Sequence, residues 1–437
     1  MKMSSALVDL AQKTAETLKK YNIVKIISHN DTDGITAAGI MSHALIRSGI
    51  IFHTIIVDHL GQEIIDRLNA RVCGEEGAVL FCDMGSGQPD LLNQLKDEVL
   101  IIDHHQIIGD HSDHVQINPH MVGIDGSALL SASGTAYYVA CAMGDNTDLA
   151  GLALAGAIGD KQRMEGPNGD ILQQATDNGV VSVKKGLKVP DGPVDEVLLT
   201  LVEPYLDTAG DKSATKEFLD QLDISGPIND LGQEDMIKLA SAIALKIAKR
   251  SEPSIVQSIV GDILILNREV VPNIHTFEWI INCCGKKDQP SLALSLCLRD
   301  SSVLDEAVRL CVGYQQGLIE QIRSAEELVK EMTNIRYIAL ENAVGTGIIA
   351  GTMIRYVCPD KPLITLNKVE DIVRISARGT DRLVEKGLDL AIAMRDASVA
   401  VGGQGGGHNI ASGAHIPHST EKDFLSVADK IIGGQLI

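Results

Sequence analysis

The chain has little of what membrane proteins, disulfide-bonded secreted proteins and zinc ribbons are built from. None of its apolar runs approaches the roughly 20 residues that a membrane-spanning helix needs. Its eight cysteines include no Cys-x-x-Cys pair, which argues against a zinc ribbon and against a disulfide framework. The N-terminal stretch MKMSSALVDLAQKTAETLKK lacks the apolar core of a signal peptide. We therefore expect a soluble, cytoplasmic protein with reduced cysteines and no membrane partner.

Positive charge and aromatic rings are also scarce. The formal net charge is −20, and aromatic residues make up 3% of the chain. A surface that attracts nucleic acid everywhere leaves a basic footprint, and an extended base-stacking platform needs aromatic side chains. Both are excluded. An acidic protein can still bind phosphate at a carboxylate-lined site, because bound cations make such a site positive.

The first third of the chain alternates apolar strands with amphipathic helices. We predict helices at residues 5–20, 34–49, 133–143 and 148–160, and strands at residues 22–28, 51–57, 78–84 and 99–105. Strands that are apolar throughout and separated by helices are typical of a parallel sheet covered on both faces. The fold class expected here is therefore α/β, with a doubly wound parallel sheet.

The rest of a 437-residue chain is too long to share one core with this sheet. Residues 166–235 are rich in Gly, Pro and Asp, which predicts loops and short helices, and residues 235–330 are mainly helical. Strands at 335–343, 362–368 and 371–379, with helices at 347–357 and 381–395, indicate a smaller α/β domain that a glycine-rich loop at 402–407 interrupts. We expect three parts: residues 1–200, a mainly helical connecting region 201–332, and residues 333–437.

Polar clusters follow the strands of the first part. Ligands of doubly wound sheets gather at the carboxyl ends of the strands, so these side chains should share one edge. The clusters are His29, Asp31 and Asp33 after the first strand, Asp83 after the third, Asp103, His104 and His105 after the fourth, and Asp160 after a helix.

Carboxylates that meet at one edge repel each other unless cations neutralise them. A mixed set of carboxylates and imidazoles suits manganese, magnesium or zinc, and manganese fits an oxygen-rich set best. Six ligands with one bridging carboxylate suffice for two metals roughly 3.5–4 Å apart, a spacing used for phosphoryl displacement.

Each cluster alone has a plainer explanation. An Asp after a strand is commonly a helix N-cap, which would account for Asp33 before Gly34, and for Asp83 or Asp160 taken singly. Three metal-ligand side chains within five residues are harder to explain as caps. The plain explanation must also hold four times at the same edge, so we favour the metal site.

A second group of residues lies near the C-terminus. Glycine fills five of the six positions from Gly402 to Gly407 and precedes His408, which fits either a flexible loop or a backbone that closely approaches an anion. Arg374, Ser376 and Arg378 alternate on a predicted strand and share one face. The two arginines fit either a phosphate clamp or surface ion pairs.

These residues resemble a known family. The segments SHNDTDG, FCDMG, IIDHH and GAIGD are similar, in this order, to the four metal-binding motifs of DHH phosphoesterases. The segment GGQGGGHNIASGAHIP resembles the glycine-histidine motif of the DHHA1 domain. Two more segments, FEWIINCCGKKDQPSLALSLCLRD and ARGTDRLVEKGLDLAIAMRDASVAVGGQGGGH, resemble archaeal RecJ-like single-strand exonucleases, including the GINS-associated nucleases. The resemblance implies a DHH domain, a helical middle region and a smaller C-terminal α/β DHHA1 domain.

The resemblance also implies roles for individual residues. His29 and Asp31 would bind one metal, Asp33, His104 and Asp160 the other, and Asp83 would bridge the two. His105 would either donate a proton or contact the metal ligands without binding a metal itself, and Asp103 would orient the histidines. A substrate phosphate would be held by Gly405, Gly406, Gly407 and His408, with help from Arg378, Arg374 and Ser376.

The function implied is a metal-dependent exonuclease that hydrolyses single-stranded DNA or RNA to mononucleotides by a two-metal mechanism, in DNA replication or repair. Two divalent cations are expected as cofactors, with Mn²⁺ ahead of Mg²⁺. The alternatives are a phosphodiesterase for short oligonucleotides or cyclic dinucleotides, and a replisome component that binds GINS and has accessory nuclease activity. The sequence leaves the polarity of digestion, the sugar preference and the oligomeric state open.

Overall fold

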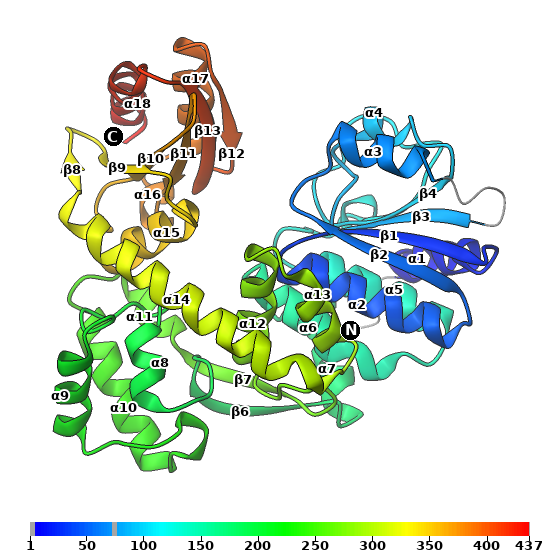
Figure 1. The fold of residues 1–437 in the computed structure, drawn as a ribbon, viewed down its shortest axis with the longest axis horizontal. Coiled ribbons are helices and arrows are strands. Elements are labelled where there is room, and N and C mark those ends of the chain that lie inside the picture. The colour runs from blue at the N-terminus through cyan, green and yellow to red at the C-terminus, as the bar shows by residue number, and fades with distance from the viewer. Residues whose placement is uncertain (1–4, 72–76, 437) are drawn as a thin grey trace. The chain divides into compact units, whose positions relative to one another are not determined.

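The structure is a computed structural model that describes residues 5–71 and 77–436. The chain forms two compact units, Met1–Lys185 with Asp262–Cys311, and Gly186–Gly261 with Val312–Ile437 (Figure 1). Strands β6 (Val181–Leu187) and β7 (Val260–Leu266), which pair, and helix α14 (Leu304–Glu327) each run across a boundary between the units. Within the described residues, no helix is both long and apolar enough to cross a membrane.

The first unit is built on a parallel five-stranded sheet with the order β2-β1-β3-β4-β5. Its strands are β1 (Ile23–His29), β2 (Ile51–Val57), β3 (Gly77–Cys82), β4 (Glu98–Ile102) and β5 (Val115–Ile117). Every residue of β3 is buried, as expected for an aliphatic strand with helices on both faces. Because all strands run the same way, the carboxyl ends of β1, β3 and β4 lie at one edge.

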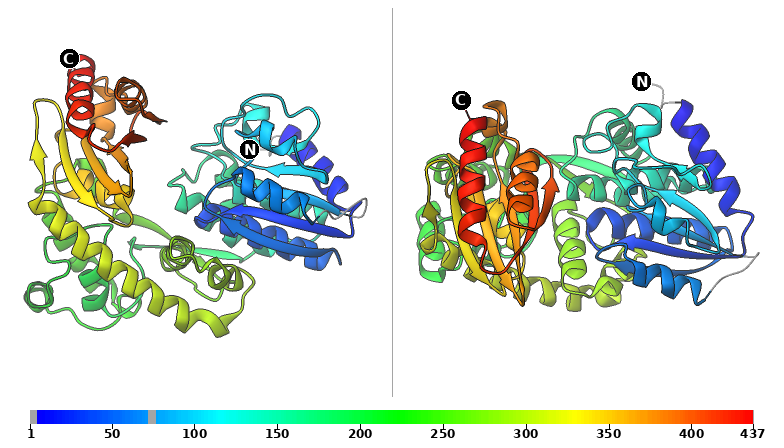
Figure 2. Two further views of the ribbon diagram at one scale, coloured as in Figure 1. Left: turned by 45° about the horizontal axis from the view of Figure 1, so that its top comes forward. Right: turned by 90° about the horizontal axis from the view of Figure 1, so that it is seen from above.

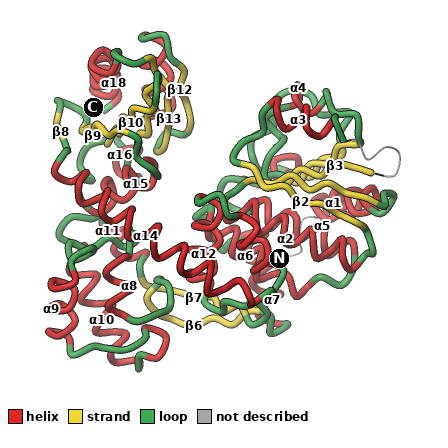
Figure 3. The backbone as a smooth tube through the Cα atoms, viewed as in Figure 1, coloured by secondary structure: helices red, strands yellow, loops and turns green. Residues whose placement is uncertain are grey.

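Helices cover both faces of this sheet. On one face, Phe81 of β3 packs with Leu68 of α3 (Gln62–Asn69) and Leu92 of α4 (Pro89–Leu92). The other face contacts α2 (Thr32–Arg47) and α5 (Ala132–Met143), and α1 (Ser5–Leu18) packs against α5 and the short edge strand β5. Figures 1 and 3 show these two layers. The predicted doubly wound parallel sheet is confirmed.

Four more helices thicken the layer around α2. They are α6 (Ala150–Gly159), α7 (Gly166–Asp177), α12 (Ile274–Lys286) and α13 (Pro290–Cys297). Helices α6, α12 and α13 contact α2, although α12 and α13 come more than 220 residues later in the chain. Residues 262–311, which we expected in the connecting region, therefore pack within the first unit. The expected domain limits at 200 and 332 stay predictions.

A partly exposed ion-pair cluster joins this late segment to the sheet helices. Asp148 accepts hydrogen bonds from Arg47 of α2 at 2.7 Å and from Arg299, after α13, at 2.7 Å. Arg299 also pairs with the buried Glu269 at 3.0 Å. Burial opposes the charge of Asp148, but the hydrogen bonds from the two guanidinium groups outweigh it and hold its pKa below the usual value.

We expect Asp148→Asn to lower the free energy of unfolding by about 1–2 kcal/mol at pH 7, because it leaves two arginines short of a charged partner in a partly solvated site. A depressed pKa in the folded protein gives stability that is present above the unfolded pKa of about 4 and is lost as the pH falls further. The difference between the variant and the wild type should therefore shrink below about pH 4. Urea unfolding from pH 3 to 7 measures it. Asp220→Asn, in the exposed pair with Lys216, is the control and should change stability by less than about 0.5 kcal/mol.

The second unit combines a helical part with a smaller α/β part. The helices α8 (Val194–Thr200), α9 (Lys212–Leu222), α10 (Gln233–Ile247) and α11 (Pro253–Ser258) precede β7, and α15 (Thr346–Tyr356) follows α14. Leu198 of α8, Leu219 of α9 and Ile243 of α10 share one buried core with Ile322 of α14 and Met353 of α15. Helix α14, which lies within the region predicted to be helical, thus supplies one wall of this core.

The α/β part holds a six-stranded sheet with the order β12-β13-β11-β10-β9-β8. Its strands are β8 (Lys330–Glu331), β9 (Arg336–Glu341), β10 (Leu363–Val369), β11 (Ile372–Arg378), β12 (Gln404–Gly407) and β13 (Ala411–Pro417). Strands β9 and β10 are parallel, and the other pairs are antiparallel. Helix α15 contacts β10 and β11, while α17 (Leu390–Ala400) packs against β12, β13 and α18 (Glu421–Gln435) (Figure 2).

Several local predictions were wrong. The glycine-rich stretch after α17 is strand β12 and not a loop, because its backbone pairs with β13 and Gly405 lies so close to Met394 that a Cβ would overlap the carbonyl. The helix expected at 381–395 is two helices, α16 (Asp381–Glu385) and α17, separated by Gly387 at a φ of +104°. Within the stretch predicted as loops and short helices, the Gly-Pro pair at 166–167 begins α7, since Pro is well accepted in a first helical turn.

Candidate metal centre

The first cluster lies where β1 ends and α2 begins. Asp31 is the N-cap of α2, and its side chain accepts a hydrogen bond from the N–H of Gly34 at 3.0 Å. Its other carboxylate oxygen lies 2.8 Å from Nδ1 of His29, the last residue of β1. Burial opposes charge on His29, but its hydrogen bonds to Asp31 and Asp83 raise the pKa of the imidazole to about 10. The N-cap expected at Asp33 is therefore Asp31, which also faces the cluster.

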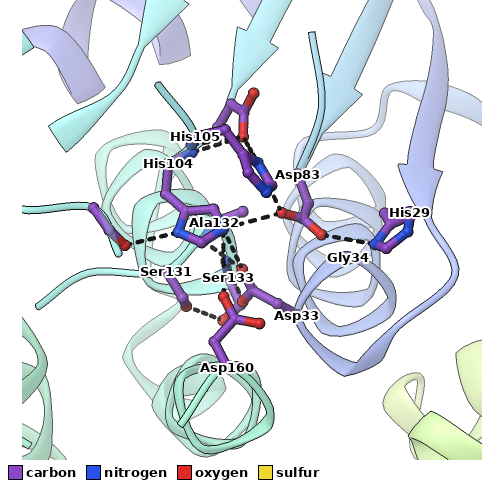
Figure 4. Close-up of polar contacts among 12 residues, drawn as sticks. His29, Asp33, Gly34, Asp83, His104, His105, Ser131, Ala132, Ser133 and Asp160 are labelled. Carbon is purple, nitrogen blue, oxygen red and sulfur yellow. Dashed lines mark hydrogen bonds and ion pairs between the residues drawn. The ribbon is translucent and has the colours of Figure 1, made fainter. Parts of the chain in front are cut away.

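Asp33 lies in the first turn of α2 and is fully buried. Its carboxylate accepts hydrogen bonds from the N–H groups of Ala132 at 2.6 Å and Ser133 at 2.9 Å, the first residues of α5 (Figure 4). A helix N-terminus stabilises negative charge. Burial and the nearby Asp83 nevertheless raise the pKa of Asp33 to about 6.

Asp83 follows β3 and stands between the two histidines. Its Oδ2 is 3.4 Å from Nδ1 of His29, and its Oδ1 is 3.3 Å from Nε2 of His104 (Figure 4). The backbone of Asp83 is left-handed, with a φ of 58°, a strained conformation that is concentrated at functional sites. Oδ1 is buried and accepts no hydrogen bond from the described residues. A buried carboxylate oxygen without a donor fits a cation ligand.

His104 follows β4, and the backbone carbonyl of Gly126 orients its imidazole ring. Its Nδ1 lies 2.8 Å from the carbonyl oxygen of Gly126, so Nδ1 carries the proton and donates it. In the neutral ring the other nitrogen, Nε2, carries no hydrogen, and it lies 3.3 Å from both Asp83 and Asp160 and 3.8 Å from Asp33. Metal-binding histidines are typically held in this way, with the second nitrogen bonded to a carbonyl or carboxylate.

Asp160 completes the cluster at the C-terminal end of α6. The C-terminus of a helix disfavours negative charge, so a capping role does not explain a carboxylate at this position. Burial and the neighbouring Asp33 raise the pKa of Asp160 well above its usual value. A site that raises the pKa of two carboxylates favours either protons or cations.

The ligand atoms fall into three sets within which all lie within 4.8 Å of one another. The sets are His29 with Asp31 and Asp83, Asp33 with His104 and Asp160, and Asp83 with Asp103, His104 and His105. All eight residues predicted from the sequence for this site are thus brought together. The first two sets each offer an imidazole and two carboxylates, a donor set that suits Mn²⁺ or Mg²⁺, and Asp83 stands between them.

Asp103 and His105 form a pair beside these sets. Oδ1 of the buried Asp103 accepts hydrogen bonds from Nδ1 of His105 at 2.8 Å and from the backbone N–H of His104 at 2.7 Å. Its Oδ2 accepts from the N–H of Ser86 at 2.9 Å. The hydrogen bond to Asp103 raises the pKa of His105, whose side chain is 58% exposed. This hydrogen bond is compatible with the predicted role of Asp103 in orienting the histidines, which stays a prediction.

The second unit holds the other predicted residues. Arg378 ends β11, and one of its guanidinium nitrogens lies close to Gly347 in the first turn of α15. No acidic side chain pairs with Arg378 anywhere in the described residues, and burial lowers the pKa of its guanidinium. The hydroxyl groups of Thr346 and Ser376 lie 3.3 Å apart at the same end of the sheet. A largely buried cation beside a positive helix N-terminus is a candidate anion site.

His408 and the glycines lie next to this arginine. In the sheet Arg378 is opposite Ala411 of β13, and the N–H of His408 donates to the carbonyl of Ala411 at 2.8 Å. Gly406 of β12 has no atom within 4 Å of the position that a Cβ would take, so its backbone is open to approach. Arg374 is exposed and shares the face of Ser376 and Arg378, as predicted. The expected surface ion pairs are not found for the two arginines among the described residues.

Helix α12 also contributes to the metal centre, and the sequence motifs did not predict this. Nζ of Lys286 donates to Oδ1 of Asn30 at 3.1 Å, and its charge helps to keep the pKa of Asp31 low. Glu278 lies 3.4 Å from the hydroxyl of Thr32. A Cβ on Gly285 would overlap the carbonyl oxygen of Asn30, so only glycine lets α12 approach this closely. The Gly-Lys pair at 285–286 was the only signal available in the sequence.

The chain matches two family models, the N-terminal domain of the DHH family at residues 23–157 and the DHHA1 domain at residues 335–434. An uncharacterized protein of Methanocaldococcus jannaschii is 31% identical over 427 residues, which cover 96% of this chain and 95% of that protein. The chain belongs to the DHH family of phosphoesterases. This DHH protein carries the complete predicted ligand set of the family.

Solved structures share the fold of this DHH protein at low identity. RecJ of Thermus thermophilus in complex with Mn²⁺ has a TM-score of 0.64 and 14% identity, over 98% of this chain and 55% of that RecJ. The chain thus spans about half the length of that protein. CDC45 of Entamoeba histolytica has a TM-score of 0.63 and 11% identity, over 98% of both chains. The fold is therefore RecJ-like, with a DHH domain followed by a DHHA1 domain.

Proposed function

We propose that this DHH protein is a metal-dependent phosphodiesterase that acts as an exonuclease on single-stranded DNA or RNA. The observation that carries the proposal is the position of Asp83, whose two carboxylate oxygens face His29 and His104 in neighbouring ligand sets. Such a pair of sets suits two divalent cations, Mn²⁺ before Mg²⁺. When bound, they supply Lewis acidity and offset the negative charge of a reacting phosphodiester.

The residues around the cations would hold the substrate and move protons. His105 donates Nδ1–H to Asp103, and this hydrogen bond raises the pKa of the imidazole, which favours its protonated form. Its Nε2–H can then protonate the leaving oxygen of a nucleotide as a general acid. Lys286, beside Asn30 and exposed at the tip of α12, would attract a substrate phosphate.

The anion site of the second unit supports a substrate that carries phosphate. A desolvated guanidinium without a carboxylate partner costs free energy unless an anion offsets it. Phosphate matches the guanidinium with two parallel hydrogen bonds and can also accept from the hydroxyl groups of Thr346 and Ser376. His408 and the backbone of Gly405, Gly406 and Gly407 would complete this site, with Arg374 at its exposed margin.

We expect Arg378→Met to raise the dissociation constant of adenosine monophosphate about 10- to 100-fold, the effect of losing one charge-assisted hydrogen-bonding group. The melting temperature should stay the same or rise, because the variant removes a buried unpaired charge. Calorimetric titration with the nucleotide measures the first effect, and Mn²⁺ affinity should not change. Arg395→Met, which removes an exposed arginine that pairs with Asp396, is the matched control. Equal nucleotide affinity in both variants would remove the anion site from the proposal.

A phosphodiesterase for short oligonucleotides or cyclic dinucleotides is the second candidate. The net charge of −20 favours it, because a long polyanion is repelled by an acidic surface more than a dinucleotide is. Digestion of labelled strands of 2 to 50 nucleotides separates the two. Progressive shortening of the long strands supports the exonuclease, and cleavage confined to the shortest ones supports this alternative.

Binding to GINS subunits within a replisome is a further expectation from the resemblance to GINS-associated nucleases. The complete ligand set argues against a purely structural role. Co-purification with GINS tests it, and a GINS-binding protein should keep its partner in Asp83→Ala and His104→Ala variants that have lost cleavage.

The decisive assay for the proposed function uses strands labelled at the 5′ or the 3′ end, in DNA and RNA versions. They are incubated with Mn²⁺, Mg²⁺ or a chelator. Cation-dependent release of labelled mononucleotides from one end is the expected result, and it also gives polarity and sugar preference. Intact strands of every length in the presence of both cations would refute the proposal.

A further inference from the structure

A network of hydrogen bonds around Ser86 supports the Asp103–His105 pair. Its centre is Ser86, which has no exposed surface. The Ser86 hydroxyl oxygen accepts hydrogen bonds from Nε2 of Gln116 at 2.7 Å and from Nδ2 of Asn118 at 3.0 Å. Both amides are nearly or fully buried, so a loss of their shared acceptor would leave two donors without water or protein partners.

The network makes hydrogen bonds both to Asp103 and to the backbone of His105. The N–H of Ser86 donates to Oδ2 of Asp103 at 2.9 Å, so the hydroxyl contacts hold the segment that fixes this carboxylate. Nδ2 of Asn118 donates to the carbonyl oxygen of His105 at 2.9 Å. Both the carboxylate that orients the imidazole and the backbone that carries it are thereby attached to the same buried group.

The loop after His105 is attached to Ser86 as well. The carbonyl oxygen of Ser86 accepts hydrogen bonds from the N–H of Ile108 at 2.9 Å and from Nε2 of His111 at 3.0 Å. Asn118 adds a second role, because its Oδ1 accepts from the N–H of His120 at 3.0 Å. The N–H, the hydroxyl oxygen and the carbonyl oxygen of Ser86 thus each hold a different part of the surroundings of His105.

We propose that Ser86, Gln116 and Asn118 are positioning residues that fix the rotation of Asp103 and the backbone of His105. The fixed carboxylate keeps the proton of His105 on Nδ1 in the neutral imidazole and points Nε2 towards the substrate. This inference rests on the proposed function, in which His105 protonates the leaving oxygen. It assigns the proton-transfer geometry to residues that bind neither metal nor substrate.

Asp103 depends on Ser86 because its two carboxylate oxygens are held by different numbers of hydrogen bonds. Oδ1 accepts from His105 and from the backbone, and Oδ2 accepts from the N–H of Ser86 as its one donor among the described residues. If the segment at Ser86 shifts, Oδ2 loses this donor and the carboxylate can turn away from the imidazole. The metal ligands are held by other contacts, which are the N-terminus of α5 for Asp33 and the carbonyl of Gly126 for His104. Cation affinity should therefore survive such a shift.

The test combines Ser86→Ala with His105→Ala in a double-mutant cycle on the full-length, cation-loaded protein. A labelled oligonucleotide, whose leaving oxygen needs a proton, serves as the substrate. Ser86→Ala should lower kcat about 10- to 100-fold, the usual effect of losing a residue that orients a site group, while KM and the dissociation constant of Mn²⁺ stay within twofold. In the His105→Ala background the same substitution should cause no further loss. An equal loss in both backgrounds would overturn the proposal, because it would show a general structural effect.

A second readout does not depend on activity. With ¹⁵N-labelled histidine and Mg²⁺, the ring nitrogens of His105 report its tautomer, and their signals are assigned by their disappearance in His105→Ala. The Nδ1–H form should dominate in the wild type at a pH where the ring is neutral, and a mixture should appear in Ser86→Ala. An unchanged tautomer in Ser86→Ala would refute the positioning role even if the protein hydrolysed no phosphodiester, so the two failures are distinguishable.

Two further variants guard against a trivial result. Gln116→Met removes one of the two amide donors while keeping the volume of the side chain, and should give a smaller loss of kcat with the same dependence on His105. Asn69→Ala removes an amide that donates to the carbonyl of Gln94 at 2.8 Å. Among the described residues, Asn69 has no hydrogen bond to Ser86, Gln116 or Asn118. This variant should leave kcat, KM and the tautomer of His105 unchanged.

Discussion

Replacing Asp83 with asparagine should lower kcat by about 10³-fold or more, the largest effect expected for any single substitution in this DHH protein. Asp83 contributes one carboxylate oxygen to each of the two neighbouring ligand sets. An asparagine keeps the shape of the side chain but offers one oxygen and no charge. Both cations should therefore bind more weakly, and the loss should be greater than for a residue that serves one cation. Single-turnover hydrolysis of a labelled oligonucleotide in Mn²⁺ measures it.

The same substitution should not unfold the protein. In the presence of a chelator, Asp83→Asn removes one of several carboxylates that repel each other at the site, so the melting temperature should equal or exceed that of the wild type. Asp97→Asn is the matched control, because Asp97 is a buried aspartate at the opposite end of the sheet that pairs with Lys25. It should keep full activity. Hydrolysis by Asp83→Asn within tenfold of the wild type would show that Asp83 does not join the two ligand sets.

Gly285→Ala should cause the second largest effect, through the packing of α12 against the metal centre. An alanine Cβ would overlap the backbone carbonyl oxygen of Asn30, which cannot move like the end of a flexible side chain. Either α12 or the loop that carries His29 and Asp31 must shift. We expect a loss of about 2–4 kcal/mol in unfolding free energy, typical of overpacking and strain in a core, and a fall in kcat of about 100-fold.

The control for this prediction is Gly317→Ala. Gly317 lies in helix α14, and no atom lies within 4 Å of the position of an added Cβ. Alanine should stabilise the helix by about 0.5–1 kcal/mol without changing hydrolysis, since glycine is the poorer helix former. Urea unfolding and steady-state kinetics on both variants separate crowding at Asn30 from a general effect of glycine replacement. Wild-type stability and activity in Gly285→Ala would mean that α12 does not pack on this loop.

The metal centre could be predicted from the sequence because its residues follow the ends of apolar strands. His29, Asp83 and His104 each come directly after or at the end of a strand of one parallel sheet, and such ends meet by geometry. The position of Asp160 does not follow from the sheet alone, since this residue comes after a helix. The structure shows why Asp160 lies beside the other ligands: α6 packs on α2, and the first turn of α2 carries Asp33.

The contribution of α12 could not be predicted in the same way. Lys286 and Gly285 lie more than 250 residues after Asn30, and the chain passes through the helices of the second unit before it returns. No local pattern encodes such a return, which depends on tertiary packing. The pairing of β6 with β7 escaped prediction for the same reason, since the two strands are widely separated in the sequence.

The glycines of β12 illustrate another limit. Their local preference is for turns, and no residue pattern around them predicts a strand. In the structure, Gly405 lies against Met394 and Ser398 of α17, where any side chain would collide. The requirement for glycine comes from close packing between a strand and a helix, and this same packing leaves the backbone of Gly406 open beside the Arg378 site.

The central claim is that side chains from β1, β3, β4, α2 and α6 hold two divalent cations on either side of Asp83. Anomalous diffraction from crystals grown with Mn²⁺ tests it most directly. The account predicts two manganese peaks roughly 3.5–4 Å apart, one beside His29 and Asp31 and the other beside Asp33, His104 and Asp160, with Asp83 contacting both. A single peak, or peaks that Asp83 does not contact, would contradict it.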